Sequence, residues 1–178
     1  MTLRSLLSFL CCLLAVALLV PAAASAADFP TVLGHYESVR LALIQDTVDG
    51  TAVPRLALAS TLGTLVAEFD AEAARVAPES ADSARQLLDE ARRAAEQLAK
   101  APDLETTRSA FYELTKPLVR YRELMVGDKP VVAYCSMARK SWLQPTEEIG
   151  NPYHGQSMPR CGSVVSTRAE PTNATGSR

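Results

Sequence analysis

The sequence lacks the residue patterns on which most small enzymes depend. Its only imidazoles are His35 and His154, and neither lies beside a serine nucleophile motif. It also has no glycine-rich nucleotide-binding pattern and no His-Glu-x-x-His run, which are the motifs that carry phosphate binding and zinc-dependent hydrolysis. We therefore expect a protein that is not an enzyme.

An excess of basic residues is missing as well. The 178 residues contain 18 Lys and Arg against 20 Asp and Glu, which gives a net charge of −2 at pH 7, and both signs are mixed along the chain. Binding to nucleic acid calls for a basic patch on the protein. We expect no nucleic-acid partner.

The first 26 residues have the order of a secretory signal peptide. Arg4 supplies a positive charge, residues 5–20 are apolar, and Pro21 opens a run of small residues that ends in an Ala-x-Ala pattern. That order predicts cleavage after Ala26 and export to the bacterial periplasm. The apolar run is shorter than the about 20 residues that a spanning helix needs, so we expect no membrane span after cleavage.

Residues 27–128 predict an antiparallel four-helix bundle, so the fold class is mainly α. Apolar residues recur every three or four positions in stretches 30–48, from 54 to before 78, from 81 to before 102, and 103–125. Ser80 and Asp103 are expected N-caps, and the second helix has a thin polar face that predicts deep burial. Four such helices joined by short connections bury their apolar faces against each other. The expected inward residues are Val32, Tyr36, Val39, Leu43, Ile44, Leu58, Leu62, Leu65, Val66, Phe69, Ala84, Leu87, Leu88, Ala91, Ala94, Leu98, Phe111, Leu114, Leu118, Tyr121 and Met125.

The composition changes after Asp128, and residues 129–167 predict a short β-hairpin with an ordered loop that packs on the bundle. Residues 130–135 and 161–166 each contain a Val-Val pair and are typical of short strands. If they pair antiparallel, Cys135 and Cys161 meet at one end. The last residues, 168–178, have no apolar pattern and predict a disordered tail.

Soft metal donors are concentrated between the two predicted strands. Thiolate, thioether and imidazole groups together favour Cu(I), and its relative Ag(I), over hard ions such as Mg(II). Thioethers need no deprotonation, and structural zinc is disfavoured because no Cys-x-x-Cys pair is present. The candidate metal ligands are Cys135, Met137, His154, Met158 and Cys161.

Other interpretations of the same residues stay open. Two cysteines in an exported domain usually pair, so a Cys135–Cys161 disulfide is as well supported as thiolate ligation. Methionines more often fill core gaps than bind metal, and we expect Trp142 to anchor the loop against the helices. In that case the chain is a disulfide-stapled module that docks on an envelope partner.

The segment also resembles a bacterial envelope domain of unknown function that occurs alone or fused to CusB-type adaptors of heavy-metal efflux pumps. The resemblance is carried by Cys135-Ser-Met-Ala138, Trp142-Leu143, Asn151-Pro-Tyr-His-Gly155 and Met158-Pro-Arg-Cys-Gly162. Tyr36 and the run Arg108–Phe111 in the helical part match that domain too.

This chain departs from the domain at Ser136, where proline is common, and at His154, where an aromatic residue is common. The resemblance implies a role in copper or silver efflux or tolerance, with an envelope or efflux-system protein as the partner.

Overall fold

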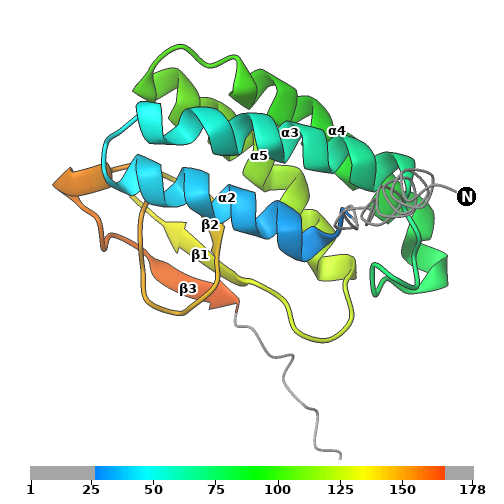
Figure 1. The fold of residues 1–178 in the computed structure, drawn as a ribbon. Helices are drawn as coiled ribbons and strands as arrows, with labels where there is room; N and C mark the ends of the chain where they lie inside the picture. The colour runs from blue at the N-terminus through cyan, green and yellow to red at the C-terminus, as the bar shows by residue number, and fades with distance from the viewer. Residues whose placement is uncertain (1–26, 167–178) are drawn as a thin grey trace, which may run out of the picture.

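The computed structural model describes residues 27–166, and the expected signal peptide and the expected tail both lie outside them. This part of the chain is mainly helical, with a small antiparallel sheet at its C-terminal end (Figure 1). The four α-helices are α2 (Phe29–Ile44), α3 (Ala52–Ala67), α4 (Ala81–Ala99) and α5 (Leu104–Leu124), and short 3-10 turns cover Asp49–Thr51, Pro78–Ser80 and Gly155–Ser157. No helix of residues 27–166 is long and apolar enough to cross a membrane.

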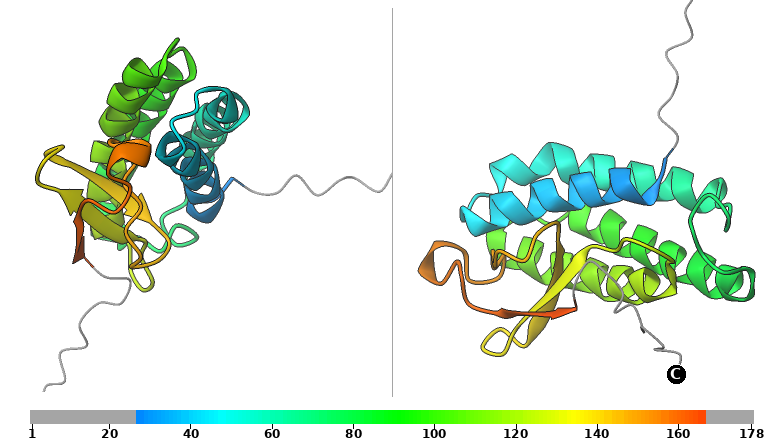
Figure 2. Two further views of the ribbon diagram at one scale, coloured as in Figure 1. Left: turned by 90° about the vertical axis from the view of Figure 1, so that its left-hand side faces the viewer. Right: turned by 90° about the horizontal axis from the view of Figure 1, so that it is seen from below.

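The helices lie side by side, and the sheet covers one side of them (Figures 1 and 2). Helix α3 packs against both α2 and α4, and α4 packs against α5. Most of the expected inward residues form one apolar core, with Ile44, Val66, Ala94 and Met125 only half-buried. The core therefore forms as the 3.6-residue periodicity predicts.

One local prediction about the helices is wrong, and a second is confirmed only in position. Helix α3 is not deeply buried along its first turn, because Val53 is 78% exposed and Leu56 is 63% exposed. Ser80 is the N-cap residue of α4 as predicted, but its side chain makes no capping hydrogen bond, since the preceding 3-10 turn leads directly into the helix. The Asp103 prediction is confirmed: its side chain accepts a hydrogen bond from the backbone N–H of Thr106 at 2.8 Å.

Helix α2 ends at Ile44 rather than at residue 48, where two backbone hydrogen bonds close it: the Asp46 N–H donates to the Leu43 carbonyl and the Thr47 N–H donates to the Ala42 carbonyl, both at 3.2 Å. Arg108 donates to the carbonyl of Leu43 at 2.9 Å, and the Gln156 amide donates to the carbonyl of Ile44 at 2.8 Å. Asp46 then adopts a left-handed backbone with φ of 56°. A local backbone turn with one left-handed residue therefore ends this helix, and the side chains of Arg108 and Gln156 bond to its last carbonyl groups in addition.

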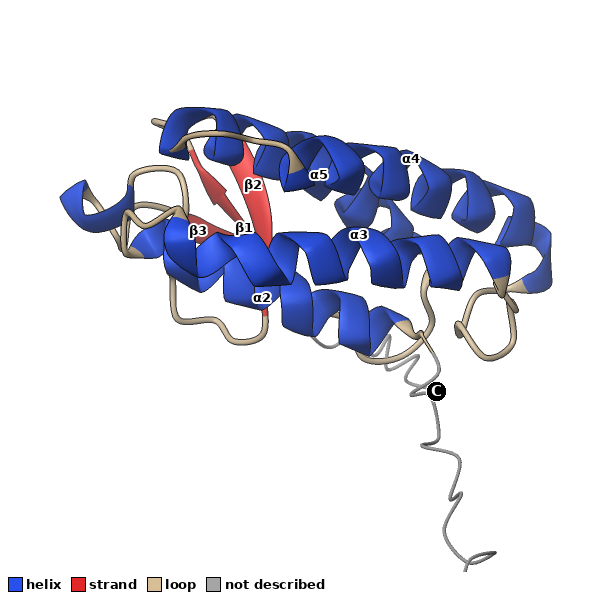
Figure 3. Ribbon diagram, turned by 45° about the horizontal axis from the view of Figure 1, so that its top comes forward, coloured by secondary structure: helices blue, strands red, loops and turns tan. Residues whose placement is uncertain are grey.

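The sheet contains three strands in the order β2-β1-β3, where β1 is Val131–Cys135, β2 is Lys140–Gln144 and β3 is Ser163–Ser166 (Figure 3). The predicted antiparallel pairing of the first and last strands is confirmed, with Ala133 opposite Val164. The hairpin itself is between β1 and β2, which pair with Ala133 opposite Trp142. Strand β2 was not predicted, because Lys-Ser-Trp-Leu-Gln carries no β-branched residue and its place is set by packing.

The sheet is attached to the helices through β2, which packs on α5. Tyr36 of α2 is completely buried, stacks on Phe111 with ring centroids 4.4 Å apart, and accepts a hydrogen bond from the backbone N–H of Leu143 at 3.2 Å. Its hydroxyl is also 2.7 Å from that of Thr115, which itself donates to the Phe111 carbonyl. A single phenol therefore ties α2, α5 and β2 together.

Two buried tyrosines provide a matched test of this junction. Tyr36→Phe leaves the buried N–H of Leu143 without its acceptor, so we expect it to lower the free energy of unfolding by about 1–3 kcal/mol. Tyr121→Phe should change it by less than about 0.5 kcal/mol, because the Tyr121 hydroxyl has no hydrogen-bond partner within residues 27–166. Urea denaturation of both variants measures the difference, and equal losses would contradict the role given to Tyr36.

Candidate functional site

The two cysteines meet at the C-terminal end of β1. Cys135 is the last residue of β1 and is fully buried, while Cys161 follows a turn closed by its own N–H and the carbonyl of Met158 at 3.2 Å. The Cys135 and Cys161 sulfur atoms are 2.9 Å apart, and both residues are present as free thiols. The predicted convergence of these sulfurs is what the antiparallel pairing of β1 and β3 produces.

Gly162 allows the chain to reach this position. Its backbone φ is 140°, and a Cβ atom there would lie 2.7 Å from the Trp142 ring and 3.0 Å from the carbonyl oxygen of Tyr134. Any other residue would push the chain off the indole. Trp142 is completely buried, as expected of an anchor, and its Nε1 donates to the Gln144 side chain at 2.7 Å.

Asn151 holds the segment between β2 and β3 in one shape. Its buried side chain donates to the carbonyl of Cys161 at 2.7 Å and accepts from the backbone N–H groups of Tyr153 at 2.8 Å and His154 at 3.3 Å. Its own N–H donates to the Pro159 carbonyl at 2.7 Å. The residue was not among the predicted site residues, although an Asn-Pro-Tyr turn is a place where an asparagine side chain commonly bonds to nearby backbone.

Arginines of the helical part fasten the same segment from outside. Arg40 of α2 donates to the Gly150 carbonyl at 2.5 Å, and Arg108 of α5 donates to the Pro152 carbonyl at 2.8 Å. Arg108 also forms an ion pair with Asp46 just after α2. The segment is therefore fixed to both α2 and α5.

The surroundings of Cys135 give the two thiols different pKa values. Burial disfavours the Cys135 thiolate, but hydrogen bonds from Cys161, from the backbone N–H groups of Ala138 and Met137 and from Asn151 outweigh it and lower its pKa. The hydrogen bond to Cys135, followed by burial, raises the pKa of Cys161. The two shifts have opposite signs because one proton is shared: Cys135 ionises first while Cys161 keeps its hydrogen.

The remaining predicted ligands surround this pair less closely. Met137 lies in the turn after β1 with 65% of its surface exposed, and Met158 is half-buried at the start of the turn that leads to Cys161. The Nε2 atom of His154 is buried without a hydrogen-bond partner among the described residues. Residues 27–166 contain no group of three or more His, Cys, Asp and Glu side chains able to hold a metal ion, so His154 does not join the two thiols in such a group.

The possible metal donors are therefore the two thiols of Cys135 and Cys161, with the thioethers of Met137 and Met158 close to them in sequence. Such donors fit a soft ion of low coordination number and do not fit Mg(II) or Ca(II), which require oxygen ligands. No protein-family model, curated protein or solved structure matched this chain. The resemblance to the envelope domain stays a prediction.

Asn151→Ala tests whether this side chain holds the segment. It removes partners from three backbone groups, so we expect the free energy of unfolding to fall by at least about 2 kcal/mol. Gln156→Ala is the control: it removes hydrogen bonds to Ile44 and Gln45 that are exposed, and should cost less than about 1 kcal/mol. Urea denaturation measures both, and a small loss for Asn151→Ala would show that the segment is held by other contacts.

Ionisation of the reduced pair should occur in two separated steps. One thiolate forms below the ordinary thiol pKa of about 8.5 and the second above it, which a pH titration of thiolate ultraviolet absorbance can follow. Cys161→Ala should leave one step, at higher pH than the first step of the unaltered protein, because Cys135 stays buried and loses a donor. Two thiols that titrate together near the ordinary value would contradict the shared proton.

Proposed function

We propose that this protein binds a soft metal ion, Cu(I) or Ag(I), through the thiolates of Cys135 and Cys161. In this proposal it is a periplasmic, non-enzymatic accessory protein of heavy-metal efflux or tolerance, and its helices form an antiparallel bundle that braces the binding segment. The observation that carries the proposal is the 2.9 Å approach of two free thiols. One of them lies in surroundings that favour its thiolate form.

The hydrogen bonds at Cys135 support a ligand role for its sulfur. A thiol must lose its proton before it binds a metal ion, and the Ala138 N–H lies 3.4 Å from the Cys135 sulfur. Donors of this kind stabilise negative charge on sulfur and are a recurrent feature around metal-bound thiolates. Because Cys135 ends the central strand of the sheet, its sulfur is also held in place before any ion arrives.

Cys161 is the ligand that would adjust. Metal–thiolate bonds are about 2.3 Å long, so two sulfurs on one ion stand roughly 3.8–4.6 Å apart, which is farther than the 2.9 Å between them here. Cys161 is half-buried and stands between a turn and Gly162 rather than inside a strand. A shift of about 1–2 Å at Cys161 would make room for the ion.

The thioethers of Met137 and Met158 are the supplementary donors in this proposal. Met137 follows Cys135 by two residues, and its exposed side chain is not committed to the core. Met158 precedes Cys161 by three residues, across a closed turn. Since thioethers carry no proton to lose, they would keep binding the ion in mildly acidic surroundings where thiols are protonated.

The short sulfur–sulfur distance equally favours a second function without metal. In an oxidising compartment the pair would close into a disulfide, and a link across 26 residues stabilises the folded chain by about 3 kcal/mol in the chain-entropy estimate. The protein would then be a disulfide-stapled helical module that docks on another envelope protein. The redox state of the thiols separates the two functions.

A Cu(I) competition titration under reducing conditions tests the proposal. We expect one ion per chain, and Cys161→Ser should weaken binding by at least about a hundredfold because half of the thiolate set is lost, a cost of about 2.7 kcal/mol. Met137→Ala combined with Met158→Ala should weaken it by about tenfold. Met125→Ala is the control, because Met125 is the C-cap residue of α5 and its backbone pairs with Val76.

Ag(I) should compete with Cu(I) for the same site. Mass spectrometry of alkylated protein from the periplasm would report whether the two thiols are free or joined. If the fully reduced protein binds neither ion, the metal proposal fails and the stapled module stands. If the double methionine variant binds Cu(I) as tightly as the unaltered protein while Cys161→Ser binds it more weakly, the thioethers are packing groups. The site then consists of the two thiolates.

A further inference from the structure

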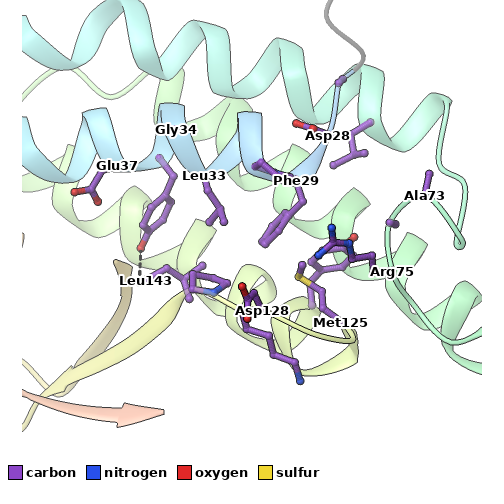
Figure 4. Close-up of a pocket in the computed structure, with 18 of the residues that line it drawn as sticks. Asp28, Phe29, Leu33, Gly34, Glu37, Ala73, Arg75, Met125, Asp128 and Leu143 are labelled. Carbon is purple, nitrogen blue, oxygen red and sulfur yellow. Dashed lines mark hydrogen bonds between the residues drawn. The ribbon is translucent and has the colours of Figure 1, made fainter. Parts of the chain in front are cut away.

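A cavity of about 780 Å³ lies at the opposite end of β1 from Cys135. It opens between the N-terminal half of α2, the loop that follows α3, the residues that connect α5 to β1, and the end of β2. Figure 4 shows Phe29 and Leu33 projecting from α2 into this space, with Met125, Asp128 and Leu143 on the other side. The volume falls in the range of about 300–1,000 Å³ that is typical of small-molecule sites.

The inner wall of the cavity is apolar and aromatic. Phe29 and Tyr121 pack with ring centroids 4.7 Å apart, and the half-buried Leu33 and Met125 leave part of their surface to the cavity. The Tyr121 hydroxyl is buried and has no hydrogen-bond partner within residues 27–166, and this burial raises the pKa of Tyr121 to about 12. The wall is thus suited to a hydrocarbon or aromatic group, and the Tyr121 phenol within it stays neutral.

The rim of the cavity is negatively charged. Four lining carboxylates, those of Asp28, Glu68, Asp70 and Asp128, make no ion pair with any residue of the described range. The carboxylate of Glu37 also lines the cavity but is taken up by Arg40 of the same helix. Against these four stand two lining cations, Arg75 and Lys129.

We propose that this cavity binds an amphiphilic cation, with its apolar body against Phe29 and Leu33 and its ammonium group at the carboxylate rim. Apolar surface drives the body into the cavity, and near a protein surface an ammonium about 4 Å from a carboxylate gains several-fold more than it would in bulk water. An anion of the same shape would meet the excess of carboxylates instead. The inference is independent of the metal proposal, because none of the five candidate ligands lines the cavity.

Binding of three probes with the same chain, decyltrimethylammonium, decyl sulfate and decanol, tests the proposal below their micelle concentrations. Isothermal titration calorimetry of the purified protein should show the cation binding at least tenfold more tightly than the sulfate, with the alcohol between them. The ratio of the affinity for the cation to the affinity for the sulfate should fall as salt is added, because salt screens the rim charges. Equal affinities for the three probes, or no binding of the cation, would overturn the proposal.

Two helical glycines provide a matched pair of variants. A Cβ atom would meet nothing within 4 Å at Gly34, which lines the cavity, or at Gly63 of α3, which does not. At both positions a β-carbon therefore meets no steric obstacle. Gly34→Phe should weaken binding of the cation by at least tenfold because the ring obstructs the cavity, and Gly63→Phe should leave it unchanged.

Removal of rim charge tests the second half of the proposal. Glu68→Gln combined with Asp128→Asn should reduce the preference for the cation over the sulfate to about threefold or less, while decanol binds as before. If the preference survives this change, the carboxylates do not select the ligand. If Gly34→Phe and Gly63→Phe weaken binding equally, the cation binds elsewhere on the protein.

Discussion

The hydrogen bonds of Asn151 are the constraint on which the C-terminal segment depends. A segment that leaves β2 and returns as β3 has many backbone groups to satisfy, and one buried amide satisfies groups of Cys161, Tyr153 and His154 at once. An amide can do this because it carries a donor and an acceptor on one short side chain. Since the carbonyl of Cys161 is one of its partners, the same side chain that shapes the segment also positions the second sulfur.

The helical part could be predicted from sequence because its signal is periodic and local. Leu58, Leu62 and Leu65 are buried where a 3.6-residue repeat places them, and Asp103 caps α5 as its chemistry suggests. The meeting of Cys135 and Cys161 could also be predicted, since it follows from antiparallel pairing of two strands with recognisable composition. These features need no knowledge of distant contacts.

The rest depends on contacts between residues far apart along the chain. Strand β2 exists because Trp142 and Leu143 are buried against the helices and Tyr36 accepts from the Leu143 N–H. Arg108 bonds to the last turn of α2 from more than sixty residues away. The cavity beside Phe29 is lined by four separate stretches of chain. No pattern within any one stretch marks these features, so sequence alone could not place them.

The unequal burial of the two sulfurs determines which of them an external thiol would attack if they were joined in a disulfide. Cys135 is fully buried at the end of β1, while Cys161 keeps some contact with solvent. A small thiol from solution therefore reaches the Cys161 sulfur of an oxidised pair and not the Cys135 sulfur. The departing group is then Cys135, whose backbone donors make it the better leaving thiolate. Reduction of such a disulfide would thus begin at the more accessible Cys161 sulfur. The thiolate that leaves would be the buried Cys135 sulfur, whose negative charge is stabilised by nearby backbone N–H groups.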